Sequence, residues 1–286
     1  MDPLVSIIIP SSDRLELLDV AVKSVISQSY SNIEIVVVDD CSVVPIKNIW
    51  ADCGREIIIH RNDNKFGGAI SRNAGVSVSS GEFIGFLDDD DYYYNNKISD
   101  LMREFSSNQQ LDVVFGQIIK KSQPEPHVDL SLLSNNNIIG NNKFIKYLHT
   151  NTSLIKRDVF DSIRFDEQLG KFQDTQLHLE LVNKAICKYI KKPVAFWNDN
   201  HGLKQITNMI TEDNYLRSLH NFMTLKENLK KRSSISLNYY IYLSIKYQYM
   251  VSKYNHKFNK KVAEQNILVY YFYKLSFPFF KIINRS

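Results

Sequence analysis

Short apolar segments alternate with amphipathic ones through the first 120 residues, and this alternation limits the folds open to the chain. The apolar segments are four or five residues long, which is typical of strands buried on both faces. Strands that alternate with helices predict a parallel sheet with right-handed crossovers. We expect strands at residues 5–9, 34–38, 56–59, 83–87 and 111–115, and helices at 15–25, 68–80 and 96–105.

Four consecutive aspartates, Asp88 to Asp91, follow the fourth of these strands. Adjacent like charges are costly unless something positive lies among them, and a divalent cation that holds a diphosphate would meet this need. Taken alone, the run is explained equally well by a solvated acidic turn that caps the next helix. Pro10–Asp13 and Asp39–Asp40 also fall at strand ends, where parallel sheets bind ligands. The three stretches can therefore converge on one crevice.

The turn after the first strand argues against two common nucleotide sites. A dinucleotide-binding fold places a glycine-rich turn there, and a P-loop also needs glycines. The residues present are Pro10-Ser11-Ser12-Asp13, without a glycine. Asp13 and Glu16 instead match a capping box for the helix that follows.

The chain has 286 residues, enough for one large domain or for a domain with an appendage. No segment approaches the roughly 18 apolar residues that span a bilayer, and we expect no signal peptide at the N-terminus. Three cysteines without metal-ligand spacing predict a cytoplasmic protein with no disulfides and no zinc. Cys187 lies in a helix-like stretch, where we expect it to serve packing.

Five motifs follow one another in the first third of the chain. They are VSIIIP at 5–10, SQSY at 27–30, EIVVVDD at 34–40, SRNAG at 71–75 and GEFIGFLDDDD at 81–91. Their order and spacing resemble family 2 inverting glycosyltransferases with the GT-A fold. The resemblance is dense over residues 4–105 and resumes at 165–174. It implies an α/β fold in which helices flank a Rossmann-like, mostly parallel sheet, with a C-terminal helical appendage.

The resemblance also implies a division of the chain. Residues 1–210 would form the GT-A catalytic domain, with the nucleotide sugar bound by residues 1–120 and the acceptor by residues 121–210. Residues 211–286 would form a helical region rich in basic and aromatic side chains.

For the nucleoside of the donor, the resemblance implies three residues. Asp40 would accept the imide proton of uracil, and Pro10 and Asp13 would line the base and ribose pocket. Ser12 and Asp13 depart from the tyrosine and asparagine that the family usually carries there. From the residues alone, Asp13 is equally consistent with a helix cap, and a helix cap is the less favoured alternative for Asp40.

For the diphosphate and the metal, the resemblance implies Arg72, three aspartates and a histidine. Arg72 would contact the donor, although a surface charge is as good an interpretation. Asp90 would bind Mn²⁺ or Mg²⁺ directly, and Asp88 would be the second carboxylate of the metal motif. Asp88 or Asp89 would hold the ribose or a metal-bound water. His201 would complete the metal shell or touch the diphosphate, unless it is only structural.

The catalytic base implied by the resemblance is Asp174. It stands in the position of the aspartate in the family's Glu-Asp pair, and Gln173 replaces the glutamate. A plain helix N-cap is the alternative role for Asp174. Trp197 is equally suited to stacking on a sugar ring and to filling the core.

The reaction that the resemblance implies is metal-dependent transfer, with inversion, of a hexose or N-acetylhexosamine from a UDP-sugar to a hydroxyl of a saccharide acceptor. The acceptor would be linked to a polyprenyl diphosphate, in O-antigen or capsule synthesis. One alternative is a noncatalytic subunit that binds sugar nucleotides or serves assembly. Another is a nucleotidyltransferase, which should carry a glycine-rich, basic loop after the first strand to hold a triphosphate.

The C-terminal region differs in charge from the rest. Residues 211–286 carry a net charge of +9 and 16 of the 34 aromatic residues, whereas residues 1–210 carry a net charge of −5. Aromatics mixed with lysines at 238–242 and 270–281 predict a peripheral contact with anionic lipid at the inner face of the plasma membrane. Packing on the catalytic domain or in a homodimer is the alternative. We expect no nucleic-acid partner, because the first 210 residues are acidic.

Overall fold

The computed structural model describes residues 2–140, 142–199 and 211–258. It divides into two compact units, one made of residues 1–167 and 173–203 and the other of residues 168–172 and 204–286. His201, which the sequence places in the metal shell, lies outside the described residues.

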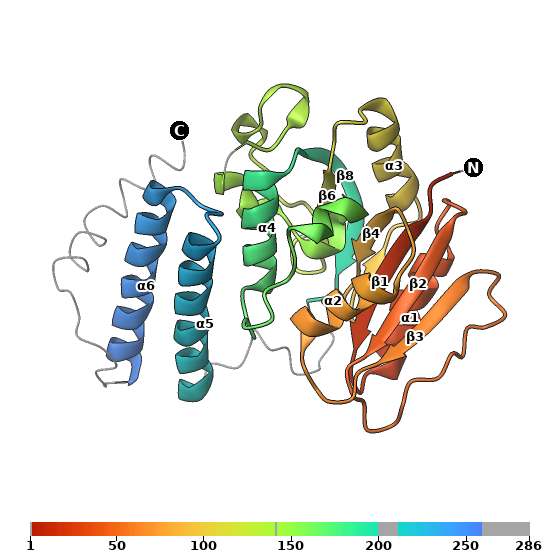
Figure 1. Cartoon of the computed structure of the whole chain (residues 1–286), viewed down its shortest axis with the longest axis horizontal. Coiled ribbons are helices and arrows are strands. Elements are labelled where there is room, and N and C mark those ends of the chain that lie inside the picture. The colour runs from red at the N-terminus through yellow and green to blue at the C-terminus, as the bar shows by residue number, and fades with distance from the viewer. Residues whose placement is uncertain (1, 141, 200–210, 259–286) are drawn as a thin grey trace. The chain divides into compact units, whose positions relative to one another are not determined.

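The first unit is built on one eight-stranded sheet with the order β3-β2-β1-β4-β7-β6-β8-β5 (Figure 1). The four strands from β3 to β4 are parallel, as the alternating sequence predicts. The strands are β1 (Val5–Ser11), β2 (Ile33–Asp39), β3 (Glu56–Arg61), β4 (Phe83–Phe86), β5 (Tyr92–Tyr93), β6 (Val113–Lys120), β7 (Ser153–Lys156) and β8 (Cys187–Trp197).

The helices of this unit connect the strands in the expected places. The α-helices are α1 (Leu15–Ile26), α2 (Gly68–Val78), α3 (Lys97–Ser107) and α4 (Gln173–Lys184). Short 3₁₀ turns lie at Leu130–Leu132, Asn135–Asn137, Asn142–Tyr147, Thr150–Thr152 and Arg157–Asp161.

The sheet departs from the parallel pattern in its second half. Strand β7 runs antiparallel between β4 and β6, and β5 pairs antiparallel with β8 at the edge. Cys187 begins β8, so the helix-like interpretation of its surroundings is wrong, although its side chain is buried as expected. The five predicted strands are confirmed, because strands buried on both faces leave continuous apolar runs in the sequence.

Helix α2 packs closely on strand β1 of the parallel half of the sheet. A Cβ atom placed on Gly75 of α2 would lie 2.3 Å from Cγ2 of Ile8 on β1. Only glycine therefore allows this approach, and it brings the residues of α2 against the strand ends.

The second unit is described through α5 (Glu212–Lys231) and α6 (Leu237–Phe258), which lie side by side (Figure 1). Their contact buries Leu219, Val251 and Tyr254, with Tyr215 and Phe258 packed against them. Asn221 of α5 accepts hydrogen bonds from the main-chain N–H groups of Gly170 and Lys171. The predicted helical C-terminal region is confirmed in the described part. Among the described helices, none combines the length and apolar character needed to cross a bilayer.

Candidate active site

The predicted polar stretches meet at the carboxyl ends of three adjacent strands, β2, β1 and β4. Oγ of Ser11, at the end of β1, donates a hydrogen bond of 2.7 Å to Asp89, which follows β4. The main-chain N–H of Asp40, which follows β2, donates to the carbonyl oxygen of Ser11 at 2.9 Å. The parallel register thus brings these residues together from three separate parts of the chain.

The four aspartates alternate between partly exposed and buried positions. The side chains of Asp88 and Asp90 are 29% and 20% exposed, whereas Asp89 and Asp91 are 1% and 2% exposed. Only Asp88 and Asp90 therefore offer carboxylate oxygens to a ligand from solvent. These are the two residues that the sequence assigns to the metal motif.

Two arginines form ion pairs with three of the four aspartates. Arg72 of α2 lies 2.5 Å from Asp88, and Arg14 lies 2.6 Å from Asp89 and 3.0 Å from Asp90. Sequence reasoning missed Arg14, although its place directly after the Pro10–Asp13 stretch was a usable signal. Positive charge within the run is thus supplied in part by the protein itself.

The environment gives neighbouring aspartates opposite pKa shifts. Burial acts to raise the pKa of Asp88, but the charges of Arg72 and His149 outweigh it and the pKa falls below its usual range. Burial raises the pKa of Asp89 to about 7, even though Arg14 and Ser11 oppose the shift. Burial raises the pKa of Asp91 to about 8, with a further contribution from the charge of Asp88. The run therefore carries fewer than four negative charges near neutral pH.

Buried polar residues form hydrogen bonds with the acidic run. Nδ2 of Asn151 donates to Asp91 at 2.6 Å, and Oδ1 of Asn151 accepts from the main-chain N–H of Asp88 at 3.2 Å. Nζ of the buried Lys97 donates to the carbonyl oxygen of Asn151 at 2.7 Å and lies 3.4 Å from the ring centroid of Tyr93. Burial lowers the pKa of Lys97 well below its usual value. Neither Lys97 nor Asn151 was singled out from the sequence.

Arg72 connects the acidic run to the start of α4. Its Nη2 donates to Asp88, and its Nη1 donates to Oε1 of Gln173 at 3.2 Å. The next residue is Asp174, whose charge acts to raise the pKa of Arg72 and of His149. Because α4 begins at Gln173, Asp174 lies inside the first helical turn and not at the N-cap. A carboxylate there is favoured by the helix dipole.

Asn73, beside Arg72 in the SRNAG motif, holds the segment that precedes α4. Its Nδ2 donates to the carbonyl oxygen of Phe165 and to Glu167, both at 2.9 Å. Its Oδ1 accepts from the main-chain N–H of Phe165 at 3.2 Å. Arg72 and Asn73 of this motif thus both contact the part of the chain that carries the predicted base.

Asp40 and Asp13 organise the loops around the predicted base pocket. The carboxylate of Asp40 accepts hydrogen bonds of 2.8–2.9 Å from Asn62 and from the main-chain N–H groups of Phe66 and Gly67. One of these donors, Gly67, directly precedes α2, whose N-terminus has no side-chain cap. Asp13 accepts from the main-chain N–H of Val43 at 2.7 Å. The capping-box prediction for Asp13 is wrong, because α1 has Arg14 as its N-cap and no side-chain cap.

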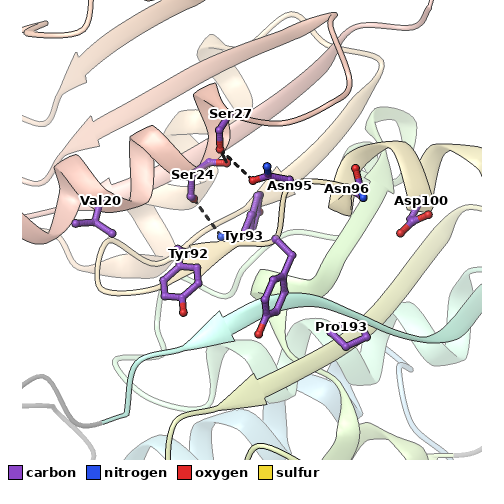
Figure 2. Close-up of a pocket in the computed structure, with 10 residues that line it drawn as sticks. Val20, Ser24, Ser27, Tyr92, Tyr93, Asn95, Asn96, Asp100 and Pro193 are labelled. Atoms are coloured by element: carbon purple, nitrogen blue, oxygen red, sulfur yellow. Dashed lines mark hydrogen bonds between the residues drawn. The ribbon is translucent and has the colours of Figure 1, made fainter.

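An open hollow of about 730 Å³ lies beside the acidic run without including it (Figure 2). Val20 and Ser24 of α1 and Ser27, which directly follows that helix, line one side, and Tyr92 and Pro193 of β8 line other parts. Ser24 accepts a hydrogen bond from the main-chain N–H of Tyr93. None of the predicted site residues lines this hollow, so it is separate from the candidate site.

A divalent cation at this site would bind through the accessible carboxylates of the acidic run. Among residues 2–140, 142–199 and 211–258, no group of three or more His, Cys, Asp or Glu side chains is placed to hold a metal. Mg²⁺ commonly binds through one or two carboxylates and completes its shell with water and substrate phosphates. The exposed oxygens of Asp88 and Asp90 fit that smaller requirement.

Comparisons with known proteins agree with this geometry. A model of "Glycosyl transferase family 2" matches residues 6–165. The chain is 26% identical over 234 residues to an uncharacterized glycosyltransferase of Rickettsia bellii, covering 75% of this chain and 33% of the relative. It is 30% identical over 174 residues to the GalNAc(5)-diNAcBac-PP-undecaprenol beta-1,3-glucosyltransferase of Campylobacter jejuni, covering 58% of this chain and 56% of the relative. The chain thus spans about a third to a half of the length of these relatives.

The fold is also found among solved structures. The structure of Staphylococcus aureus TarS 1–349 in complex with UDP-GlcNAc superposes with a TM-score of 0.64 at 17% identity, covering 88% of this chain and 80% of that one. Since the family model covers more than half of the chain, including the strand ends and the acidic run, the chain belongs to glycosyl transferase family 2.

Proposed function

We propose that this chain transfers a hexose or N-acetylhexosamine from a UDP-sugar to a hydroxyl of a lipid-linked saccharide, with inversion, in the synthesis of a surface polysaccharide such as O-antigen or capsule. The observation that carries the proposal is the Arg72 bridge. This guanidinium joins Asp88, on the donor side, to Gln173, the neighbour of Asp174. The Campylobacter relative is named for an undecaprenyl-diphosphate acceptor, and the TarS structure contains UDP-GlcNAc, which supports both substrate classes.

In this proposal Asp174 is the general base. It takes the proton of the acceptor hydroxyl while the oxygen attacks the anomeric carbon from the face opposite the leaving diphosphate. Arg72 lies close enough to interact with both Asp88 and Asp174, so it fixes the spacing between the donor and the base. That spacing matters because reacting atoms must be brought within about 3–3.5 Å of one another.

The donor is held at the strand ends. Asp88 and Asp90 would hold Mn²⁺ or Mg²⁺, which stabilises the charge that develops on a diphosphate leaving group. Pro10, Asp13 and Asp40 would surround the nucleoside, and Arg72 would contact the diphosphate. Asp89, buried and bound to Arg14 and Ser11, would act through the position of its neighbours.

The test is a substitution that separates binding from transfer. Asp174→Asn should leave UDP-sugar binding in the presence of Mn²⁺ intact and abolish transfer to acceptor. Binding is measured by thermal shift, since a ligand of the folded state raises its stability. A variant that still transfers sugar would disprove the assignment of Asp174. A wild-type protein that shows no metal-dependent shift with any UDP-sugar would count against the whole proposal and favour a noncatalytic role.

We further propose that the C-terminal region rests on anionic lipid at the inner membrane face. In α6, Leu237 and Ile241 are 70% and 48% exposed, and the region is strongly basic. Apolar side chains beside lysines favour an interface of this kind. The protein should sediment with vesicles that contain phosphatidylglycerol and remain in the supernatant with phosphatidylcholine alone. Equal behaviour with both vesicles, together with a dimer by light scattering, would favour subunit packing instead.

A further inference from the structure

A second pocket, of about 310 Å³, opens beside the candidate active site. Its described lining comes from β6, β8, the segment that follows β6 and the 3₁₀ turns around residue 147. Two lysines, two histidines and three aromatic side chains line it, and none of the described lining residues is acidic. A pocket of this composition favours an anionic ligand with an apolar or ring-shaped face.

His149 connects the pocket with the candidate active site. Its partly buried ring lines the pocket and lies 5.3 Å from the ring of Trp197, measured between centroids. Burial lowers the pKa of His149, while the charges of Asp88 and Asp174 oppose that shift. One wall of the pocket is therefore within electrostatic range of both the donor-side carboxylate and the proposed base.

The two lysines of the pocket are held against aromatic rings. Nζ of Lys120 lies 4.0 Å from the ring centroid of Trp197, and Nζ of Lys146 lies 4.8 Å from that of Tyr147. Each lysine also interacts electrostatically with one aspartate, Lys120 with Asp199 and Lys146 with Asp129. The carboxylate of Asp199 accepts a hydrogen bond from Ser122, and that of Asp129 accepts one from Ser131.

Tyr189 adds an unsatisfied hydroxyl to the same pocket. Its side chain is 1% exposed, and among the described residues its Oη has no hydrogen-bond partner. Buried hydroxyls are almost always hydrogen-bonded, so a group without a protein partner points to a ligand or a water in this position. A sugar hydroxyl is a suitable partner, because it both donates and accepts.

We propose that this pocket binds an anionic acceptor saccharide, with its carboxylate or phosphate held by Lys120 and Lys146, a sugar ring against Trp197, and a sugar hydroxyl bonded to Tyr189. The inference rests on the proposed function, and it specifies the class of acceptor. The negative charge can come from a uronic acid in the saccharide or from the diphosphate that joins the saccharide to its carrier lipid. Both sources offer oxygens that accept charge-assisted hydrogen bonds from ammonium groups.

The test is equilibrium binding without a donor, measured by calorimetry on the full chain. The probes are methyl glucoside, methyl glucuronide and glucose carrying a short alkyl diphosphate. One anionic probe should bind at least about tenfold more tightly than the neutral one, as expected for a charge-assisted contact. A preference for the glucuronide assigns the charge to a uronic acid, and a preference for the diphosphate assigns it to the lipid linkage.

Matched variants locate the charge. Lys120→Gln combined with Lys146→Gln should bring the ratio of anionic to neutral affinity close to one. Lys121→Gln removes the same charge from an exposed neighbour outside the described lining and should leave the ratio unchanged. Tyr189→Phe should weaken all three probes by a similar factor, since it removes a hydroxyl contact and no charge.

Some outcomes would overturn the inference. They are equal affinity for the neutral and anionic probes, a preference that survives the double substitution, and no binding of any probe at millimolar concentration. UDP-sugar binding is measured on the same samples. If it persists while the charge preference is absent, the inference fails and the proposed function stands. If no UDP-sugar binds, the proposed function fails first.

Discussion

Nζ of Lys97 donates a 2.7 Å hydrogen bond to the carbonyl oxygen of Asn151, a residue 54 positions away, and both residues are buried. The side chain of Asn151 in turn bonds Asp91 and the main chain of Asp88. Burying the amino group of Lys97 is costly, and its hydrogen bond to Asn151 and its contact with the ring of Tyr93 offset part of that cost. The position of the Asp88 carboxylate thus depends on the buried residues Asn151 and Lys97.

Asn151→Ala should lower both stability and transfer. The change leaves the buried carboxylate of Asp91 without the Nδ2 donor, and it removes the acceptor for the main chain of Asp88. We expect a loss of about 2–4 kcal/mol in the free energy of unfolding, measured by urea denaturation. The exposed Asn135→Ala should change stability by less than about 0.5 kcal/mol. Equal effects of the two substitutions would contradict the network.

Arg72→Lys should reduce transfer although the charge is kept. Arginine reaches Asp88 and Gln173 from two different nitrogens, whereas lysine has only one terminal nitrogen. We expect kcat to fall by about 10–100-fold, because misplacement of reacting groups by about 1 Å is costly. The control is Arg103→Lys, at an arginine 65% exposed on α3. Steady-state kinetics with a circular dichroism check would show whether the loss is specific, and an unchanged kcat in Arg72→Lys would argue against the bridge.

Asp91 should make stability depend on pH near neutrality. Its pKa is raised by burial to about 8 in the folded protein, against an unfolded value of about 3.9. Between these values the folded state binds more protons than the unfolded state. The stabilising contribution is therefore complete below about pH 4 and is lost as the pH rises to about 8.

The comparison with Asp91→Asn isolates this carboxyl. Burial lowers the pKa values of His149, His178 and Lys97, so these groups titrate with the opposite sign in both proteins. Between pH 5 and 7, stability of the wild type relative to Asp91→Asn should fall by up to about 1.4 kcal/mol per pH unit, measured by chemical denaturation. Parallel curves for the two proteins would show that Asp91 is not protonated there.

Gly75→Ala should destabilise the protein through a clash. The added Cβ would lie 2.3 Å from Cγ2 of Ile8, so α2 must move away from β1. We expect a loss of about 1–3 kcal/mol, typical of overpacking, and a lower melting temperature. The same change at Gly140, where no heavy atom of the described residues lies within 4 Å of the new Cβ, should be neutral or slightly stabilising. A neutral Gly75→Ala would contradict the close approach.

The sequence predicted the parallel half of the fold because buried strands and their polar ends are local patterns. Asp88 and Asp90, which the sequence assigns to the metal motif, are the two less buried aspartates of the run, and their role as metal ligands stays a prediction. Strand β7 was missed, since four residues paired antiparallel to distant strands leave no periodic signal. Arg14, Lys97 and Asn151 were missed for a related reason. Their partners lie up to 76 positions away, and only the assembled sheet brings them together.

The alternation of exposed and buried aspartates makes the length of this segment as important as its composition. From Asp88 to Tyr93, odd and even positions face different surroundings, and the pattern continues directly into β5. Inserting or deleting one residue before the run would exchange the two sets. It would turn Asp89 and Asp91 toward solvent and bury the carboxylates of Asp88 and Asp90. The number of residues between β4 and β5 therefore constrains this site as much as the identity of its side chains.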